Sequence, residues 1–357
     1  MYIAAVSGFS FAAFTCTCLP VKGHDSHGVG YLPLYLRAVA KGTLPINLDG
    51  PSVVHDDGGA VLALDGRGGF GQVMGEKAMS MGIERARAHG VALVTLKNSH
   101  HLARIGAWAE QCTNAGMASL HFANVAAHPP LVAPHGGADA RLGTNPMAIG
   151  FPSDPARPMI LDFATSAYAL GKVREAMGRG EPMPEGALID SGGAPTTDPS
   201  VMFPGSKPGA PEEHGQALGA LLPAGEHKGG GLALACELLG AVLSGGRTIT
   251  GEKGGGVILN SMTTVIVDVA ATAGAGGGMN FLRAEAEAVF DFVKASPPRP
   301  GGQLPFVLLP GEGERIVEAA REQEGIPLSA GTWQDLMDVG ATLGLDEDEM
   351  NAHIDDR

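Results

Sequence analysis

The chain has 357 residues, of which 38 are acidic and 24 are Lys or Arg, so its formal net charge is −14. This excess of acid argues against nucleic acid as a partner, because phosphate contacts need clustered Lys and Arg. Hydrophobic residues make up 44% of the chain, which is enough for the core of one large or two ordinary domains.

Four cysteines, Cys16, Cys18, Cys112 and Cys236, form no Cys-x-x-Cys pair and show no zinc-type spacing. Cys112 and Cys236 fall on apolar helix faces, which favours reduced core thiols and a cytoplasmic protein. Residues 1–21 carry no charge, but they lack the basic start of a secretory signal and the uniform apolarity of a spanning helix. We therefore expect no membrane partner.

Hydrophobic patterning along the chain alternates between the period of strands and that of helices. It predicts strands over 52–55, 61–65, 91–96, 117–125, 147–151, 159–162, 258–269 and 306–312. It predicts helices over 26–40, 72–89, 102–115, from about 165, and over 226–246, 282–294, 314–324 and 332–343. In the helix over 226–246, the apolar stripe is expected to comprise Leu232, Cys236, Leu239 and Leu243. Such alternation predicts an α/β fold, with the first and last helices as a separate helical layer.

The stretch over 97–116 carries the strongest functional signal. Two histidines, His100 and His101, follow the strand over 91–96 and precede an amphipathic helix that ends at Gly116. Ligand sites in α/β sheets lie at such strand-to-helix turns. A second Ser-His pair, Ser26–His27, precedes the first helix. Since histidine titrates near neutrality, the pattern indicates general acid–base chemistry.

Other chemistry-bearing groups are Arg104, Asp162 and Lys228, each at a predicted turn. The segment GRGGFG (66–71) matches G-x-G-x-x-G, but no acidic residue ends the next strand to bind a ribose, which favours a plain turn. The chain contains no H-E-x-x-H or H-x-H pair, so we expect no metal and disfavour a metal hydrolase. It also contains no G-x-S-x-G elbow, which disfavours a serine nucleophile.

Six segments, in order, resemble the malate/L-lactate dehydrogenase family of the ureidoglycolate and sulfolactate dehydrogenase type. They are GHDSHGVGYLPLYLRAV (23–39), NSHHLARIG (98–106), RLGTNPMAIGFP (141–152), LDFATSAYALGK (161–172), HKGGGLALACELLGAVLSGG (227–246) and ILNSMTTVIVD (258–268). The resemblance implies a non-Rossmann, NAD(P)-binding, three-layer α/β/α core with a mixed sheet. It also implies a homodimer with the active site near the subunit interface. The cofactor-binding core is expected over 61–280. A discontinuous helical region for dimerisation and the substrate side is expected over 1–60 and 281–357.

By this resemblance, His101 is the acid/base residue, and Ser26 and His27 line the catalytic site. Cofactor contacts are implied for His27, Arg104, Ile105, Gly106, Leu161, Asp162, Phe163, Ala164, Thr165, Lys228, Asn260, Gly311, Glu312, Gly313 and Glu314. Substrate contacts are expected from Arg37, Arg141 and Asn145, with Arg104 as a further candidate, because an arginine pairs well with a carboxylate.

The expected reaction is the reversible reduction of a 2-oxo acid to a 2-hydroxy acid, with NAD favoured over NADP. A cyclic imino-acid reductase and an inactive cofactor-binding homologue are the alternatives. Two departures from the family stand out. Tyr31 occupies a position where many members carry arginine, so a role in anchoring the substrate is not transferred to it. Residues 1–22 look unrelated to the helical segment that precedes this motif in members, which points to a mis-assigned start or a frameshift upstream.

Overall fold

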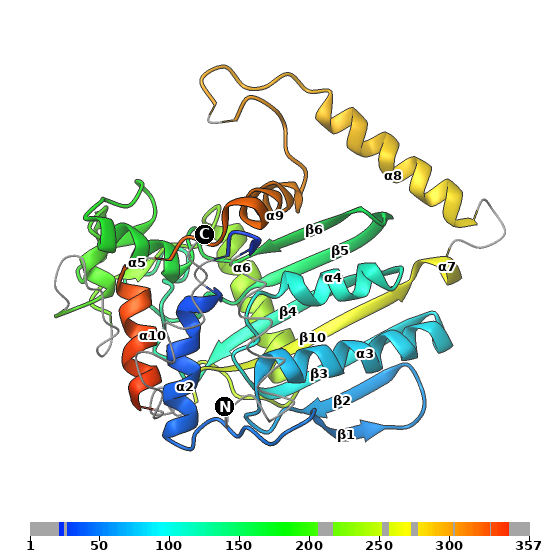
Figure 1. The fold of residues 1–357 in the computed structure, drawn as a ribbon, viewed down its shortest axis with the longest axis horizontal. Coiled ribbons are helices and arrows are strands. Elements are labelled where there is room, and N and C mark those ends of the chain that lie inside the picture. The colour runs from blue at the N-terminus through cyan, green and yellow to red at the C-terminus, as the bar shows by residue number, and fades with distance from the viewer. Residues whose placement is uncertain are drawn as a thin grey trace.

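The computed structural model describes residues 21–24, 27–205, 217–251, 257–272, 278–302, 304–328 and 330–342. Ser26, a predicted catalytic residue, and Cys16 and Cys18 lie outside these ranges. A mixed seven-stranded sheet forms the centre of the protein, in the order β1-β2-β3-β10-β4-β5-β6 (Figure 1). Its strands are β1 (Ser52–Asp56), β2 (Val61–Asp65), β3 (Val91–His100), β4 (Met117–Ala126), β5 (Met147–Asp154), β6 (Arg157–Phe163) and β10 (Leu259–Asp268).

Helices cover both faces of this sheet. On one face lie α3 (Gly71–His89) and α4 (Gly106–Asn114), which pack on the central strands through buried side chains such as Met79 and Trp108. On the other face lies α6 (His227–Cys236), continued by a π-helical turn, η5 (Glu237–Val242), against β4 and β10 (Figure 1). The expected three-layer α/β/α core with a mixed sheet is therefore confirmed.

Strand ends that carry polar side chains meet at one end of the sheet. The register places Leu259, at the start of β10, between His100 at the end of β3 and Ala126 at the end of β4. In the neighbouring pair, Met147 at the start of β5 lies opposite Phe163 at the end of β6. This end of the sheet is where the topology gathers the predicted site segments.

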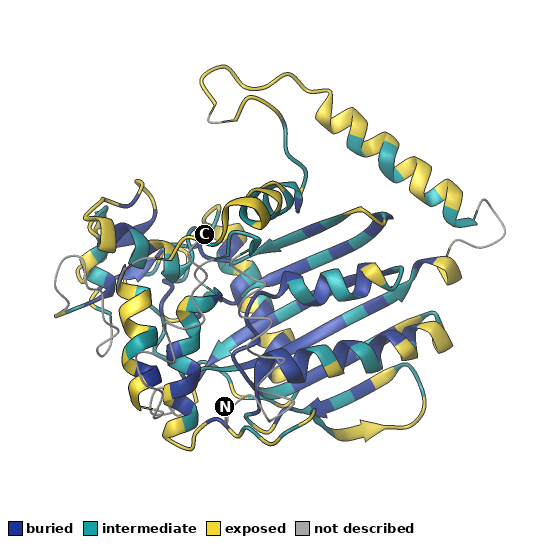
Figure 2. Cartoon of the chain, viewed as in Figure 1, coloured by how far each residue is buried: buried dark blue, intermediate teal, exposed yellow. Residues whose placement is uncertain are grey.

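The helical layer joins the two ends of the chain. Helix α2 (Leu32–Ala40), preceded by the 3-10 turn η3 (Val29–Tyr31), packs against α10 (Ala330–Thr342) (Figure 1). Helix α9 (Glu312–Glu324) is tied to the start of β6, because Arg315 Nη1 donates to the Pro158 carbonyl at 3.0 Å. Helix α8 (Gly278–Lys294), which follows the short α7 (Val269–Thr272), is largely exposed, and its Glu287 pairs with Arg157 at the start of β6 (Figure 2).

A smaller unit packs beside the main sheet. It contains a three-stranded sheet of β7 (Leu188–Ile189), β8 (Pro195–Thr196) and β9 (Ala220–Leu221), together with α5 (Leu170–Arg179) and the 3-10 turn η4 (Pro199–Met202). Its own core includes Val173, Leu188 and Phe203. No helix within the described ranges is both long and apolar enough to cross a bilayer.

Three local predictions were wrong. The segment 306–312 is not a strand, because the Glu312 carboxylate accepts from Leu309 N at 2.8 Å and starts α9 instead. The helix expected from about 165 begins at Leu170, because Thr165 N and Oγ1 both donate to the Thr144 carbonyl.

In α6–η5, the predicted apolar stripe is not the buried face, since Leu243 is 54% exposed although Cys236 is buried. Small residues lie against the sheet there. A Cβ added to Gly240 would lie 3.0 Å from Asn124 N and Phe122 O. The close approach of this backbone to β4 therefore leaves no room for the leucines between them.

The turn over 66–71 packs its backbone against the His101 segment, and a substitution at Gly71 would test this contact. A Cβ on Gly71 would lie 1.9 Å from the His101 carbonyl oxygen, which is backbone and cannot move aside. We expect Gly71→Ala to lower the free energy of unfolding by about 3 kcal/mol or more, at the upper end of the cost of overpacking. Gly178→Ala is the matched control, because Gly178 is helical with open space around it, and should gain roughly 0.5 kcal/mol. Urea unfolding of both variants measures this, and equal stability would contradict it.

Candidate active site

His101 is held by a buried tyrosine. The ring is 7% exposed, and its Nδ1 lies 2.7 Å from the hydroxyl of Tyr35, which is completely buried in α2. Gln72, at the start of α3, donates its Nε2 to the same hydroxyl at 3.1 Å. A hydroxyl oxygen has two acceptor positions, so that of Tyr35 can accept from Gln72 and also from an Nδ1–H of His101. Nε2 is then the nitrogen of His101 that a substrate oxygen would meet.

Aromatic rings line one side of His101. Tyr31 stacks on it with a centroid distance of 4.7 Å and an interplanar angle of 16°. His27 stacks on both, at 5.5 Å from His101 and 5.8 Å from Tyr31. The structure thus brings together the two histidines that were predicted from separate motifs, and adds Tyr31 to the same wall.

Burial favours the neutral form of His101, of His27 and of the neighbouring His100. Burial lowers the pKa of His27 and of His100 to about 4. Burial also lowers the pKa of His101 well below its ordinary value, and the charges of His27 and His100 add to this effect. In the free protein, therefore, His101 is a base ready to accept a proton rather than an acid that already carries one.

The histidine segment is fixed on both sides by main-chain contacts. His100 N donates to Gly69 O at 2.9 Å, and Leu102 N donates to Asn260 Oδ1 at 2.7 Å. Asn98 and Ala103, on either side of the two histidines, have positive φ angles of 53° and 57°. Non-glycine residues adopt such angles only where surrounding contacts enforce them, often at functional sites.

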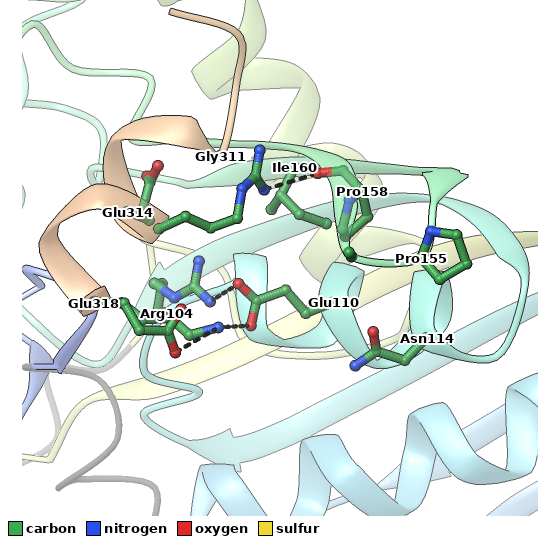
Figure 3. Close-up of a pocket in the computed structure, with 12 residues that line it drawn as sticks. Arg104, Glu110, Asn114, Pro155, Pro158, Ile160, Gly311, Glu314 and Glu318 are labelled. Atoms are coloured by element: carbon green, nitrogen blue, oxygen red, sulfur yellow. Dashed lines mark hydrogen bonds and ion pairs between the residues drawn. The ribbon is translucent and has the colours of Figure 1, made fainter. Parts of the chain in front are cut away.

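Beyond this segment, Arg104 lies at the centre of a buried charge cluster (Figure 3). It is 4% exposed, forms an ion pair with Glu110, and its Nη1 lies 3.8 Å from Asp162 Oδ2. Asp162 also accepts from Gly106 N at 2.9 Å, and Lys22 Nζ pairs with Glu110 at 2.9 Å. Four residues from three segments therefore organise the start of α4.

The carboxylates of this cluster respond differently to burial. Burial raises the pKa of Asp162, although the charge of Arg104 and the Gly106 N–H oppose the rise. For Glu110, burial also acts upwards, but the charges of Arg104 and Lys22 prevail and lower its pKa. The cluster as a whole stays polar and charged beside a cavity of about 180 Å³. Its lining includes Arg104, Glu110, Ile160, Gly311, Glu314 and Arg315.

The cavity lining has three cations, Lys22, Arg104 and Arg315, and three carboxylates, Glu110, Glu314 and Glu318, so hydrogen-bond donors and not net charge would hold a nicotinamide dinucleotide here. Arg104 Nε is buried and makes no hydrogen bond to any residue that the structure describes. Gly311, with φ of +88°, brings its backbone against Ile160 at the start of α9. An unused guanidinium N–H and a close backbone turn at one cavity leave a hydrogen-bond donor and space for such a group.

A second part of the predicted cofactor set lies around α6. Thr165 is completely buried, and its Oγ1 donates to the carbonyl oxygens of Thr144 and Asn145, both at 3.0 Å. Its own carbonyl accepts from Ala224 N at 2.9 Å. Lys228 is exposed in the first turn of α6. A helix N-terminus with an exposed lysine suits a diphosphate.

The remaining predicted cofactor residues connect these parts. Leu161, Phe163 and Ala164 run from Asp162 to Thr165 along the end of β6. Ile105 is buried and precedes α4. Glu312 and Gly313 open α9, and Glu314 lies 3.5 Å from His24. Asn260 is buried, with its amide engaged by Leu102 and Asn124.

The three predicted substrate residues lie apart from His101's ring wall. Arg37 is 49% exposed and pairs with Asp335 of α10. Arg141 is 69% exposed and pairs with Asp139. Asn145 is completely buried and donates to Glu237 and Ala233 O.

Four residues with a place in this geometry were missing from the predicted set. Tyr35 and Gln72 hold His101, and Arg174 of α5 acts electrostatically on His27, Tyr31 and His128. Glu237 binds the Asn145 amide. Only Tyr35 had a sequence signal, since it follows Tyr31 by one helical turn. The others depend on contacts between distant segments.

Comparison with known proteins agrees with this geometry. The sequence matches the malate/L-lactate dehydrogenase family over residues 13–337. It is 44% identical over 335 residues to hydroxycarboxylate dehydrogenase B of Escherichia coli, covering 93% of this chain and 87% of that protein. It is 39% identical over 325 residues to L-lactate dehydrogenase of Cupriavidus necator, covering 90% and 87%. The solved sulfolactate dehydrogenase of Methanocaldococcus jannaschii is similar with a TM-score of 0.78 at 30% identity, covering 94% and 90% of the two chains.

A Delta(1)-pyrroline-2-carboxylate/Delta(1)-piperideine-2-carboxylate reductase of Pseudomonas syringae is also similar, at 36% identity over 66% of this chain and 63% of that protein. The family match spans most of the sequence, and the best-covered relatives act on hydroxy acids. The chain belongs to the malate/L-lactate dehydrogenase family and is an oxidoreductase of 2-hydroxy acids that uses a nicotinamide cofactor.

Proposed function

We propose that this protein reduces a small 2-oxo acid to the 2-hydroxy acid, and catalyses the reverse oxidation, with His101 as the acid/base group. The observation that carries this proposal is the hydrogen bond of 2.7 Å between Tyr35 and His101 Nδ1, which leaves Nε2 as the ring nitrogen available to a substrate. A bound reduced nicotinamide supplies hydride to the carbonyl carbon. His101 delivers the proton to the carbonyl oxygen in reduction and removes it in oxidation.

The residues proposed to hold the cofactor form one path around the end of the sheet. Arg104, Gly106 and the Gly311–Glu314 turn lie at the cavity beside α4, and Lys228 lies at the start of α6. The 161–165 segment runs between them. We propose NAD as the cofactor, with NADP as the alternative, on the basis of the family resemblance. Exclusion of water near His101 comes from the stacked rings of His27 and Tyr31.

For the substrate carboxylate we propose Arg174, in place of the three arginines named from the sequence. Its charge reaches His27 and Tyr31, whereas Arg37 and Arg141 are exposed and paired elsewhere. Arg174→Ala should raise the KM for the 2-oxo acid roughly 10- to 100-fold, because a hydrogen bond to a charged group is worth about 1.5–3 kcal/mol. The KM for the cofactor should change little.

Arg179→Ala is the matched control for this prediction. Arg179 lies on the same helix, is exposed, and pairs with Glu181 at 2.7 Å. Initial-rate kinetics on both variants measure the two KM values. An unchanged KM for the 2-oxo acid in Arg174→Ala would remove the arginine from this role.

The reaction itself is tested by following reduced-cofactor absorbance. Purified protein is mixed with NADH or with NADPH, and then with pyruvate, 2-oxoglutarate, phenylpyruvate or piperideine-2-carboxylate. Consumption with one of the oxo acids supports the proposal and gives the cofactor and the substrate together. Consumption with the cyclic imine alone would overturn it in favour of an imino-acid reductase. Cofactor binding without any turnover would indicate an inactive homologue.

We also propose a cytoplasmic homodimer, with 61–280 as the cofactor-binding core and residues 1–60 and 281–357 contributing dimer and substrate-side contacts. Support comes from apolar side chains that a monomer would leave in water, among them Leu234, Leu238 and Val242 of α6–η5 and Phe292 of α8. The buried, reduced thiols of Cys112 and Cys236 suit the cytoplasm. Light scattering coupled to size exclusion measures the mass, and a monomer at micromolar concentration would contradict the dimer.

A further inference from the structure

A buried carboxylate, that of Glu237, lies on the face of the sheet that α6 and η5 cover. Glu237 opens the π-helical turn η5 and is 5% exposed. Among the residues that the structure describes, N–H groups and not a cation bind its carboxylate. Burying a charge without pairing is costly, so such a residue is kept only where hydrogen bonds compensate for it. π-helical turns are rare and occur frequently at functional sites.

Three N–H donors compensate for this burial. Glu237 Oε1 accepts from Ile249 N at 2.7 Å and from Asn124 Nδ2 at 3.3 Å, and Oε2 accepts from Asn145 Nδ2 at 2.9 Å. A set of N–H donors suits an ionised carboxylate, which only accepts. The carboxylate therefore fixes the orientation of two buried asparagine amides at once.

One of these asparagines leads towards His101. The Asn124 side chain accepts from Ser261 N at 3.0 Å, and its carbonyl accepts from Asn260 Nδ2 at 2.7 Å. Asn260 Oδ1 in turn accepts from Leu102 N at 2.7 Å, directly after His101. A continuous hydrogen-bonded chain thus connects Glu237, on one face of the sheet, with the main chain of the catalytic segment.

The other asparagine leads towards the Thr165 side. Asn145 has a positive φ of 30°, and its Oδ1 accepts from Val125 N at 3.0 Å. Its carbonyl accepts from Thr165 Oγ1 at 3.0 Å. Because the amide of Asn145 is completely buried and engaged, its conformation depends on the acceptor that Glu237 provides.

We infer that Glu237 is a positioning residue, which holds the His101 segment through Asn124 and Asn260 and the Thr165 loop through Asn145. The inference rests on the proposed role of His101, since it assigns to Glu237 the geometry of that proton transfer. The π-helical turn is what allows it. Small residues let the η5 backbone approach β4, so that the carboxylate reaches both asparagines.

The test variant is Glu237→Gln, whose added NH₂ faces N–H groups that need an acceptor. The matched control is Thr263→Val, which removes another buried hydrogen bond to η5, from Thr263 Oγ1 to Leu239 O at 2.6 Å, without a link to Leu102. Amide hydrogen exchange over residues 98–105, measured by mass spectrometry on the free protein, should be faster in Glu237→Gln and unchanged in Thr263→Val.

Kinetics provide the second measurement. In Glu237→Gln, kcat should fall roughly tenfold or more, as expected for a displaced catalytic group. The deuterium isotope effect on kcat with 4-deuterated NADH or NADPH should rise, because proton and hydride transfer then limit the rate. A smaller fraction of folded protein would lower kcat without changing the isotope effect, and this is the pattern expected of Thr263→Val.

Wild-type exchange over 98–105 together with a wild-type isotope effect in Glu237→Gln would overturn the inference. Should that variant not fold, Glu237→Asp keeps the buried charge but shortens the side chain, and is judged by the same two measurements. Failure of the His101 proposal is a separate result. It would show as turnover retained without His101, whereas the exchange data on the free protein still decide the role of Glu237.

Discussion

His101→Asn should lower kcat for 2-oxo acid reduction by about 10²- to 10⁴-fold, the usual contribution of a general acid. An asparagine occupies part of the space of the imidazole but cannot gain and lose a proton at neutral pH. The loss should appear in kcat and in kcat/KM alike, because proton transfer contributes only in the transition state. Stopped-flow or steady-state absorbance of the reduced cofactor measures it.

The control for this prediction is His89→Asn, at the exposed end of α3, where His89 Nε2 lies 2.9 Å from Gly58 O. That variant should retain full turnover. Cofactor affinity, measured by fluorescence titration, should be unchanged in His101→Asn, which separates a chemical defect from a binding defect. Near wild-type turnover in His101→Asn would show that another group moves the proton.

The sequence predicts those site residues that lie within one continuous segment of the chain. The strand over 91–100 and the helix after it carry His101 in one continuous segment, so a hydrophobic pattern and a nearby Gly116 suffice to find it. The turn over 66–71 is adjacent to this segment, but only the structure shows that Gly71 lies against the His101 carbonyl.

Non-local features escaped the sequence. Tyr35 and His101 are 66 positions apart, and Asn145 and Glu237 are 92 apart, so no spacing rule connects them. The same holds for α6–η5, where apolar leucines were expected in the core. There the packing of the π-helical turn against the sheet, and not the number of apolar side chains on a helix face, decides which face is buried.

The pH dependence of the two reaction directions should differ by several orders of magnitude. Burial keeps the pKa of His101 well below its ordinary value, so the neutral ring dominates from pH 6 to pH 9. Reduction needs the protonated ring, whose population above the pKa falls tenfold for each pH unit. Over three units, kcat/KM for reduction should therefore fall roughly a thousandfold. Oxidation needs the neutral ring, so its kcat/KM should stay flat in the same range.

The sign of this prediction is specific to His101, because the neighbouring rings do not titrate there. The pKa of His27 and that of His100 are both about 4, below the measured range. A plateau in kcat/KM for reduction between pH 6 and pH 7.5 would contradict the prediction, since it would place the pKa of the free protein above neutrality. In the substrate complex the bound carboxylate favours the imidazolium and raises the pKa of His101. The pH at which kcat for reduction begins to fall should consequently be higher than the pH at which kcat/KM begins to fall. The difference between these two pH values measures how far the substrate carboxylate raises the pKa of His101.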